Sequence, residues 1–272
     1  MISQAQKQFL AEEGDVVIPD VIPHEVCDAV IQTIMAYTGV DLDDPDSWYL
    51  NSSEGHGIVP LHHDQALWNL RQIPAVHQIF ASLYGTESLW VSVDRVSYKP
   101  PWSASMTEWT QAPVHWDCDP WQTNELSYQG VVYLTDTSAD QGAFACVPSI
   151  YKSLESYCIQ HEADEHRRSP QVADNDLLPV EGSRGSLVVF NRLMPHTSVI
   201  NRSLDHRFVQ YVTMQPAGTE QARQKLADQF LNGMPPQWAI NQQIKDQQIP
   251  EPGPVPRLSS LGRKLAGLDR WL

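Results

Sequence analysis

Basic residues are scarce in this sequence. Its 272 residues include 18 Lys and Arg against 33 Asp and Glu, which gives a formal charge of −15 at pH 7. Phosphate backbones and anionic lipid surfaces are usually bound by clustered Lys and Arg. We therefore expect neither nucleic acid nor a membrane among the partners of this chain.

Long apolar runs are missing as well. No segment has the roughly 20 consecutive apolar residues that a transmembrane helix needs. The first 17 residues contain three acidic side chains but neither a basic start nor an apolar stretch, so they do not resemble a signal peptide.

Cysteine is also rare. Cys27, Cys118, Cys146 and Cys158 form no C-x-x-C pair, and no other feature indicates export. The sequence therefore predicts a reduced, cytoplasmic setting. For Cys118 we expect the role of a small buried apolar residue.

What the sequence does contain is enough apolar surface for a packed interior. Apolar residues make up 42% of the chain and include nine tryptophans, far more than a disordered chain carries. The length suits one large domain, so we predict a single domain over 1–272. Its expected parts are a mainly helical N-terminal part (1–87), a strand-rich core (88–216) and a helical C-terminal extension (217–272).

Two helices are predicted in the N-terminal part. One begins at Pro23 and carries Val26, Val30 and Ile34 on one face. The second covers Pro74–Tyr84 and ends at Gly85. Between them, residues 39–60 are rich in Asp, Ser, Gly and Pro, which is typical of a loop.

The central region contains five short runs rich in Val, Tyr, Leu and Phe. Such runs, separated by turn signals, predict strands. No long helical pattern alternates with them, which favours a β-sandwich or barrel, and hence a mainly β fold with helical flanks. The predicted strands are Leu89–Tyr98, Tyr128–Leu134, Ala143–Val147, Ser186–Phe190 and Phe208–Met214.

Five leucines follow a Pro-rich linker at Pro250–Pro256. Their spacing of three, four, three and four places them on one face of a helix. Such a helix docks back on its own domain or forms the seam of a homodimer, so a monomer and a homodimer both stay open. The leucines are Leu258, Leu261, Leu265, Leu268 and Leu272.

A metal site is predicted from the triplet His115-Trp116-Asp117. In an extended segment residues two apart point the same way, so His115 and Asp117 would share a pocket while Trp116 faces away. Two imidazoles and one carboxylate on one side suit non-haem Fe(II), because the remaining coordination positions stay open.

Two other groups of histidines compete with this triplet. His62-His63-Asp64 leads into a helical pattern, where residues two apart diverge, so we interpret it as a polar helix start with Asp64 near the first turn. His161-Glu162-Ala-Asp-Glu165-His166 lies in a charged stretch that is most simply a solvated helix or loop.

Three later features strengthen the interpretation of this triplet as a metal site. These are the glycine-led strand 185–190, then His196 and Ser198, and then Arg207 eleven positions after that histidine. With Tyr98-Lys-Pro-Pro101 and the glycine-containing stretch 140–148, the pattern resembles the phytanoyl-CoA dioxygenase family. The resemblance runs from about Leu61 to Pro216.

The resemblance implies a double-stranded β-helix, or jelly-roll, cupin-like core and an Fe(II)- and 2-oxoglutarate-dependent oxygenase. The metal ligands would be His115, Asp117 and His196, and Arg207 and Ser198 would bind the distal carboxylate of 2-oxoglutarate. A guanidinium suits that task because its paired N–H donors match a carboxylate. Arg202 is the competing anchor.

The implied reaction consumes O2, converts 2-oxoglutarate to succinate and CO2, and hydroxylates a C–H bond of a small-molecule metabolite. The carboxylate of Asp117 disfavours halogenation, because related halogenases have Gly or Ala there. The sequence departs from the family at Ser149-Ile150-Tyr151, where Gly-Ser-His is usual. This difference bears on the substrate more than on the metal site.

Aromatic residues crowd the segment around the triplet. Candidates for the substrate pocket are Trp102, Trp116, Trp121 and Tyr133, and Met106, Trp109, Gln129 and Val131 lie near them in sequence. For each one, ordinary core packing is the competing interpretation.

Two other functions stay open. One is a cupin-like metalloenzyme that does not use 2-oxoglutarate, against which Arg207 argues. The other is a non-catalytic jelly-roll binding protein in which the histidines are structural.

Overall fold

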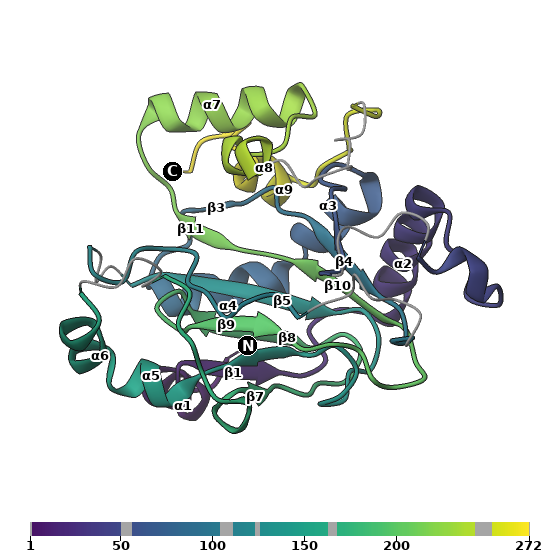
Figure 1. Ribbon diagram of the computed structural model, residues 1–272. Coiled ribbons are helices and arrows are strands. Elements are labelled where there is room, and N and C mark those ends of the chain that lie inside the picture. The colour runs from purple at the N-terminus through teal and green to yellow at the C-terminus, as the bar shows by residue number, and fades with distance from the viewer. Residues whose placement is uncertain are drawn as a thin grey trace.

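Antiparallel sheets form the centre of the molecule (Figure 1). The computed structural model describes residues 2–49, 56–103, 111–122, 126–162, 168–242 and 252–271. A six-stranded sheet has the order β1-β8-β5-β10-β4-β2, a three-stranded sheet the order β7-β6-β9, and β11 pairs with β3 in a ribbon. The strands are β1 (Asp15–Ile18), β2 (Ile58–Val59), β3 (Leu89–Val91), β4 (Val96–Lys99), β5 (Tyr128–Tyr133), β6 (Phe144–Cys146), β7 (Leu178–Pro179), β8 (Leu187–Asn191), β9 (His196–Ser198), β10 (Arg207–Tyr211) and β11 (Met214–Pro216).

Helices flank these sheets on several sides (Figure 1). The α-helices are α1 (Gln4–Glu13), α2 (His24–Thr38), α3 (Gln65–Arg71), α4 (Pro74–Tyr84), α5 (Pro148–Lys152), α6 (Leu154–Gln160), α7 (Glu220–Leu231), α8 (Gln237–Gln242) and α9 (Ser260–Leu265), with short 3-10 turns at Pro45–Ser47 and Asp174–Asp176. No helix in the described ranges is long and apolar enough to cross a membrane.

Two apolar cores cover the two faces of the large sheet. The larger one joins one face to helices α2, α3 and α4, through residues such as Ile34, Leu67 and Phe80. The smaller one lies between the large and the three-stranded sheets and includes Val131 and Phe144. Strand residues that alternate in direction supply both cores. The prediction of a mainly β, jelly-roll core with helical flanks is confirmed.

Two predicted strands are each broken in two. The run Leu89–Tyr98 forms β3 and β4 with a bend at 92–95, and Phe208–Met214 forms β10 and β11 with a bend at 212–213. The two bends lie side by side, because the Ser92 N–H donates to the Thr213 carbonyl (2.8 Å) and the Tyr211 N–H to the Arg95 carbonyl (3.2 Å). At this point the two strands leave the large sheet together and continue as the ribbon.

The helix predictions at Pro23 and Pro74 are confirmed, and α4 has the bounds that Pro74 and Gly85 predict. The N-terminal part is less purely helical than predicted, because Asp15–Ile18 pairs with β8 at the edge of the large sheet. The loop predicted for 39–60 contains a 3-10 turn and the short strand β2.

The prediction of one C-terminal helix carrying five leucines is wrong. Helix α9 covers only Ser260–Leu265; Leu258 precedes it and Leu268 follows Gly267, whose φ of +72° ends the helical path. Leu265 is fully buried, and Leu258, Leu261 and Leu268 pack against the larger core. These leucines therefore dock within the chain; Leu272 lies outside the described residues.

Candidate metal centre and cavity

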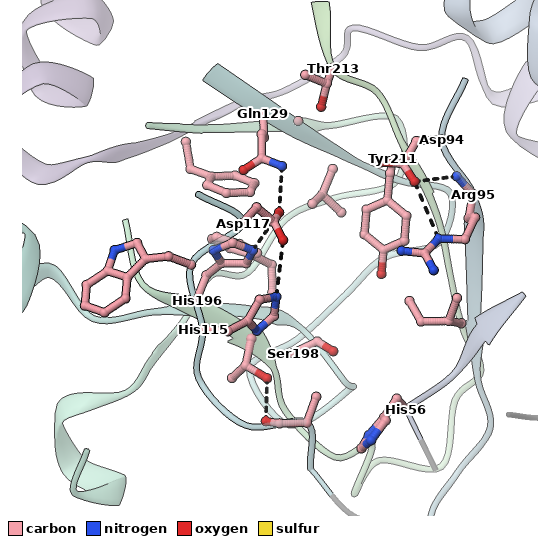
Figure 2. Close-up of a pocket in the computed structure, with 18 of the residues that line it drawn as sticks. His56, Asp94, Arg95, His115, Asp117, Gln129, His196, Ser198, Tyr211 and Thr213 are labelled. Carbon is pink, nitrogen blue, oxygen red and sulfur yellow. Dashed lines mark hydrogen bonds and ion pairs between the residues drawn. The ribbon is translucent and has the colours of Figure 1, made fainter. Parts of the chain in front are cut away.

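The side chains of His115, Asp117 and His196 meet at one point (Figure 2). Paired hydrogen bonds of 3.0 Å between the backbones of His115 and His196 join the two histidines as an isolated bridge beside β9. Asp117 Oδ1 lies 3.6 Å from His115 Nε2, and Oδ2 lies 3.6 Å from His196 Nε2. The three potential ligand atoms all lie within 4.8 Å of one another.

Second contacts orient each of these side chains. His115 Nδ1 lies 3.0 Å from the Pro113 carbonyl, and His196 Nδ1 lies 3.0 Å from the Met194 carbonyl. A ring that donates from Nδ1 to a carbonyl turns an unprotonated Nε2 toward a metal. Gln129 Nε2 donates to Asp117 Oδ2 at 2.7 Å.

The pKa shifts in the triad agree with the close contacts between its side chains. Burial raises the pKa of Asp117, but His115 and His196 outweigh it and hold that pKa well below its usual range. Burial lowers the pKa of His115, but the hydrogen bond and charge of Asp117 raise it overall. Two imidazoles and a carboxylate with one open side are a donor set that suits Fe(II). The residues present therefore fit a non-haem iron.

The open side of the triad faces a cavity of about 640 Å³, which is large enough for a small molecule. The apolar part of the cavity wall is formed by Val131, Phe144 and Phe190. On the side opposite the triad lie Asp94, Arg95 and Tyr211 (Figure 2). The remaining lining residues include His56, Ile58, Ala112, Trp116, Gln129, Arg168, Ser169, Thr197, Ser198, Arg207 and Thr213.

Arg207 and Ser198 both line this cavity. Arg207 is 1% exposed; one of its terminal nitrogens donates to Ser97 Oγ at 2.9 Å, and its Nε is buried without a partner among the described residues. Ser198 Oγ accepts a hydrogen bond of 2.7 Å from Lys99 Nζ. A buried guanidinium with an unpartnered N–H donor in a cavity wall suits an anion.

Lys99, for which the sequence predicts no role, is not one of the described residues that line the cavity but hydrogen-bonds one of them, Ser198. It is 2% exposed and is the direct cross-strand partner of Arg207. Burial and the charge of Arg207 lower the pKa of Lys99 well below its usual value. Within the described residues, no carboxylate forms an ion pair with either cation. The competing anchor Arg202 is exposed and lies over the Trp102 ring.

Only one of the four aromatic candidates lines the cavity. That residue is Trp116, whose indole Nε1 donates away to the Leu193 carbonyl at 2.8 Å. Trp121 packs on Trp116 and bonds the Cys158 carbonyl, and Trp102 is 43% exposed. Tyr133 is fully buried in the smaller core. Gln129 and Val131, from the same strand, do line the cavity, and Met106 and Trp109 lie outside the described residues.

The competing histidine groups have structural partners. Asp64 is the N-cap of α3, as interpreted from the sequence, and accepts from the Ala66 N–H. His62 contacts the Val93 carbonyl, and His63 bonds Trp68 and the Met234 carbonyl. His161 stacks on Tyr157, while residues 163–167 of that stretch lie outside the described part. Cys118 is buried, as expected.

Sequence reasoning also missed the polar wall opposite the triad. Tyr211 could have been found, because alternation along β10 places it on the same face as Arg207 and Val209. Asp94 and Arg95 gave no such signal, since they lie in a bend that the sequence presents as continuous strand.

Solved structures share this fold at low sequence identity. GIG2 of Candida albicans superposes with a TM-score of 0.73 at 13% identity, over all of this chain and 77% of the other. SnoK, a non-heme alpha-ketoglutarate-dependent carbocyclase from nogalamycin biosynthesis, gives 0.52 at 21% identity, over 79% of this chain and 85% of the other. The epimerase SnoN of the same biosynthesis gives 0.54 at 13% identity, over 79% and 82%.

Sequence comparison identifies the family. A Dictyostelium discoideum protein named as a candidate phytanoyl-CoA dioxygenase is 23% identical over 263 residues, covering 78% of this chain and 75% of its own length. The family model for phytanoyl-CoA dioxygenase matches residues 10–209, which is more than half of the chain and contains the triad and Arg207. The chain belongs to the phytanoyl-CoA dioxygenase family.

Proposed function

We propose that this protein is an Fe(II)- and 2-oxoglutarate-dependent oxygenase that hydroxylates a C–H bond of a small-molecule metabolite. One observation carries the proposal: the cavity onto which the His-Asp-His triad opens is also lined by Arg207, a buried guanidinium that has no carboxylate partner among the described residues. A metal site and a carboxylate site in one cavity match the two ends of 2-oxoglutarate.

Different residues would hold the iron and the 2-oxoglutarate. His115, Asp117 and His196 would hold the iron, and Gln129 would keep the Asp117 carboxylate in place. The bound iron supplies the activation of O2 that couples decarboxylation of 2-oxoglutarate, to succinate and CO2, with oxidation of the substrate.

Arg207 and Ser198 would bind the distal carboxylate of 2-oxoglutarate, and Lys99, whose Nζ donates to Ser198 Oγ, would hold that hydroxyl in place. A guanidinium donates charge-assisted hydrogen bonds, which are the strong ones. Val131, Phe144 and Phe190 would keep water from the reacting groups, because their side chains form an apolar wall. The cavity volume favours a small metabolite over a large thioester.

The test is anaerobic addition of Fe(II) and then 2-oxoglutarate to the purified protein, followed by the visible charge-transfer band of the chelated keto acid. We expect the band in the wild type and its loss in His196→Ala. Arg207→Ala should need at least about tenfold more 2-oxoglutarate, since a charge-assisted hydrogen bond contributes about 1.5–3 kcal/mol. Arg202→Ala is the matched control and should behave as the wild type.

The other outcomes point to the competing functions. Iron binding without a band would favour a cupin-like metalloenzyme that does not use 2-oxoglutarate. A wild type that binds no iron would favour a non-catalytic jelly-roll binding protein, and would refute the proposal.

A further inference from the structure

The wall opposite the triad is built by the two paired strand bends. Asp94 and Arg95 lie in the bend between β3 and β4, and Tyr211 and Thr213 lie at the bend between β10 and β11. Figure 2 shows Asp94, Arg95 and Tyr211 across the cavity from the triad. The wall therefore faces whatever lies between it and the metal ligands.

Within the described part of the chain, only one oxygen of the Asp94 carboxylate accepts a hydrogen bond. Oδ1 accepts from the Arg95 backbone N–H at 2.7 Å and lies 3.7 Å from Arg95 Nε. The Asp94 side chain is 17% exposed and lines the cavity. Among the described residues no donor reaches its second oxygen, Oδ2.

Two buried polar side chains hold this bend from behind. Arg71 is fully buried and donates to the Asp94 carbonyl at 2.6 Å and to the His62 carbonyl at 2.8 Å. His62 Nδ1 lies 3.3 Å from the Val93 carbonyl. Two consecutive backbone carbonyls are therefore each held by a buried side chain: that of Val93 by His62 and that of Asp94 by Arg71. Support of this kind is typical of a binding group whose position matters.

Burying a carboxylate without enough donors is costly. Burial raises the pKa of Asp94, more than Arg95 lowers it, and the charge of Asp117 adds to the rise. Asp94 and Asp117 line the same cavity. A donor from a bound molecule would remove this cost, whereas a second carboxylate there would increase it.

We propose that Asp94 is a specificity-determining residue, which accepts a hydrogen bond at Oδ2 from an amino or hydroxyl group of the substrate. The backbone N–H of Arg95 fixes Oδ1. A substrate held in this way spans the cavity from Asp94 toward the triad. The proposal rests on the proposed function, because it assigns the substrate side of the same cavity.

Three ring-matched probes test this inference: cyclohexylamine, cyclohexanol and cyclohexanecarboxylate. Their binding to protein loaded with Zn(II) and 2-oxoglutarate is measured by saturation-transfer NMR, in wild type, Asp94→Ala and Asp94→Asn. We expect the amine or the alcohol to bind the wild type better than the carboxylate does, and to lose about tenfold in affinity in Asp94→Ala. Asp43→Ala, an exposed aspartate outside the cavity, should change nothing.

The asparagine variant separates the two donors. Its amide oxygen still accepts a hydrogen bond but carries no charge, so a hydroxyl group should keep most of its affinity and an ammonium group should lose about tenfold. The variant is also nearly isosteric, which guards against a folding defect; unchanged melting temperatures would show this directly.

The charge-transfer band distinguishes failure of the proposed function from failure of the inference about Asp94. A wild type without the band refutes the proposed function. If wild type and Asp94→Ala both show the band, but no donor probe binds more weakly to Asp94→Ala, or none binds at all, the inference about Asp94 is wrong. Loss of the band in Asp94→Ala would also overturn it, because Asp94 would then support the iron or 2-oxoglutarate.

Discussion

Lys99 and Arg207 are direct cross-strand partners on β4 and β10, and both side chains are buried. Like charges opposite one another destabilise a sheet, and each of these also loses its hydration. Lys99 Nζ is held by the Ser198 and Val199 carbonyls and by Ser198 Oγ. A carboxylate bound by Arg207 would offset this repulsion.

The first prediction concerns Lys99. Lys99→Met should raise the dissociation constant for 2-oxoglutarate by up to about tenfold, because Ser198 Oγ would lose the charged donor that holds it in the cavity wall, and a hydrogen bond to a charged group contributes about 1.5–3 kcal/mol. Titration of the charge-transfer band measures it, with Arg202→Ala as control. An unchanged affinity would mean that Lys99 only ties β4 to the end of β9.

The second prediction concerns Gln129. Its amide is the donor that fixes Asp117 Oδ2, and loss of such supporting partners typically weakens metal binding about 10- to 100-fold. Gln129→Ala should therefore bind Fe(II) more weakly by that factor, as measured by competition with a chelator. Thr213→Val, elsewhere in the same cavity, should bind iron as the wild type does; equal affinities for all three proteins would contradict the prediction.

The third prediction is a pH dependence of stability. Burial lowers the pKa of His62 to about 3, against about 6.5 in an unfolded chain. Between these values the unfolded chain binds a proton that the folded protein does not, so His62 costs stability as the pH falls below about 6.5. Above that pH it has no such effect.

Urea denaturation of the metal-free protein measures this effect. On going from pH 7.5 to 5.5, the wild type should lose about 1.4 kcal/mol more unfolding free energy than His62→Asn, which does not titrate. If the difference in unfolding free energy between the two proteins stays constant with pH, His62 is not buried in its neutral form.

The fourth prediction concerns Trp271 in the C-terminal segment. Its Nε1 donates to the Leu89 carbonyl at 2.8 Å, and its ring stacks on His77 with centroids 5.4 Å apart. Trp271→Ala should lower the unfolding free energy by about 2–3 kcal/mol, somewhat less than for a fully buried tryptophan. Trp102→Ala, at an exposed position, should cost under about 1 kcal/mol in the same denaturation experiment.

Short sequence patterns predicted those features of the structure that depend on residues close together in the chain. Pro74 and Gly85 mark the ends of α4 because proline suits the first helical turn and glycine the left-handed position after the last. His115 and Asp117 were recognisable because a chelating pair needs close spacing, and His196 because its distance to Arg207 matches a family pattern.

Features that depend on pairing between distant segments could not be predicted in this way. The bend at 212–213 consists of the β-branched residues Val212 and Thr213, and the bend at 92–95 contains Val93 and is followed by Val96, so the break in each strand depends on its pairing with the other. The opposition of Lys99 and Arg207 likewise requires the register of β4 on β10. The C-terminal leucines kept helical spacing, yet Gly267 and contacts with the core decided their path.

The paired bends limit how this cavity can be redesigned. Because the Ser92–Thr213 and Arg95–Tyr211 backbone hydrogen bonds join them, a residue inserted in one bend would shift the ribbon against the sheet. A shift of one residue reverses which side chains point inward along the whole strand. Libraries aimed at new substrates should therefore vary side chains on this wall and keep both segment lengths fixed.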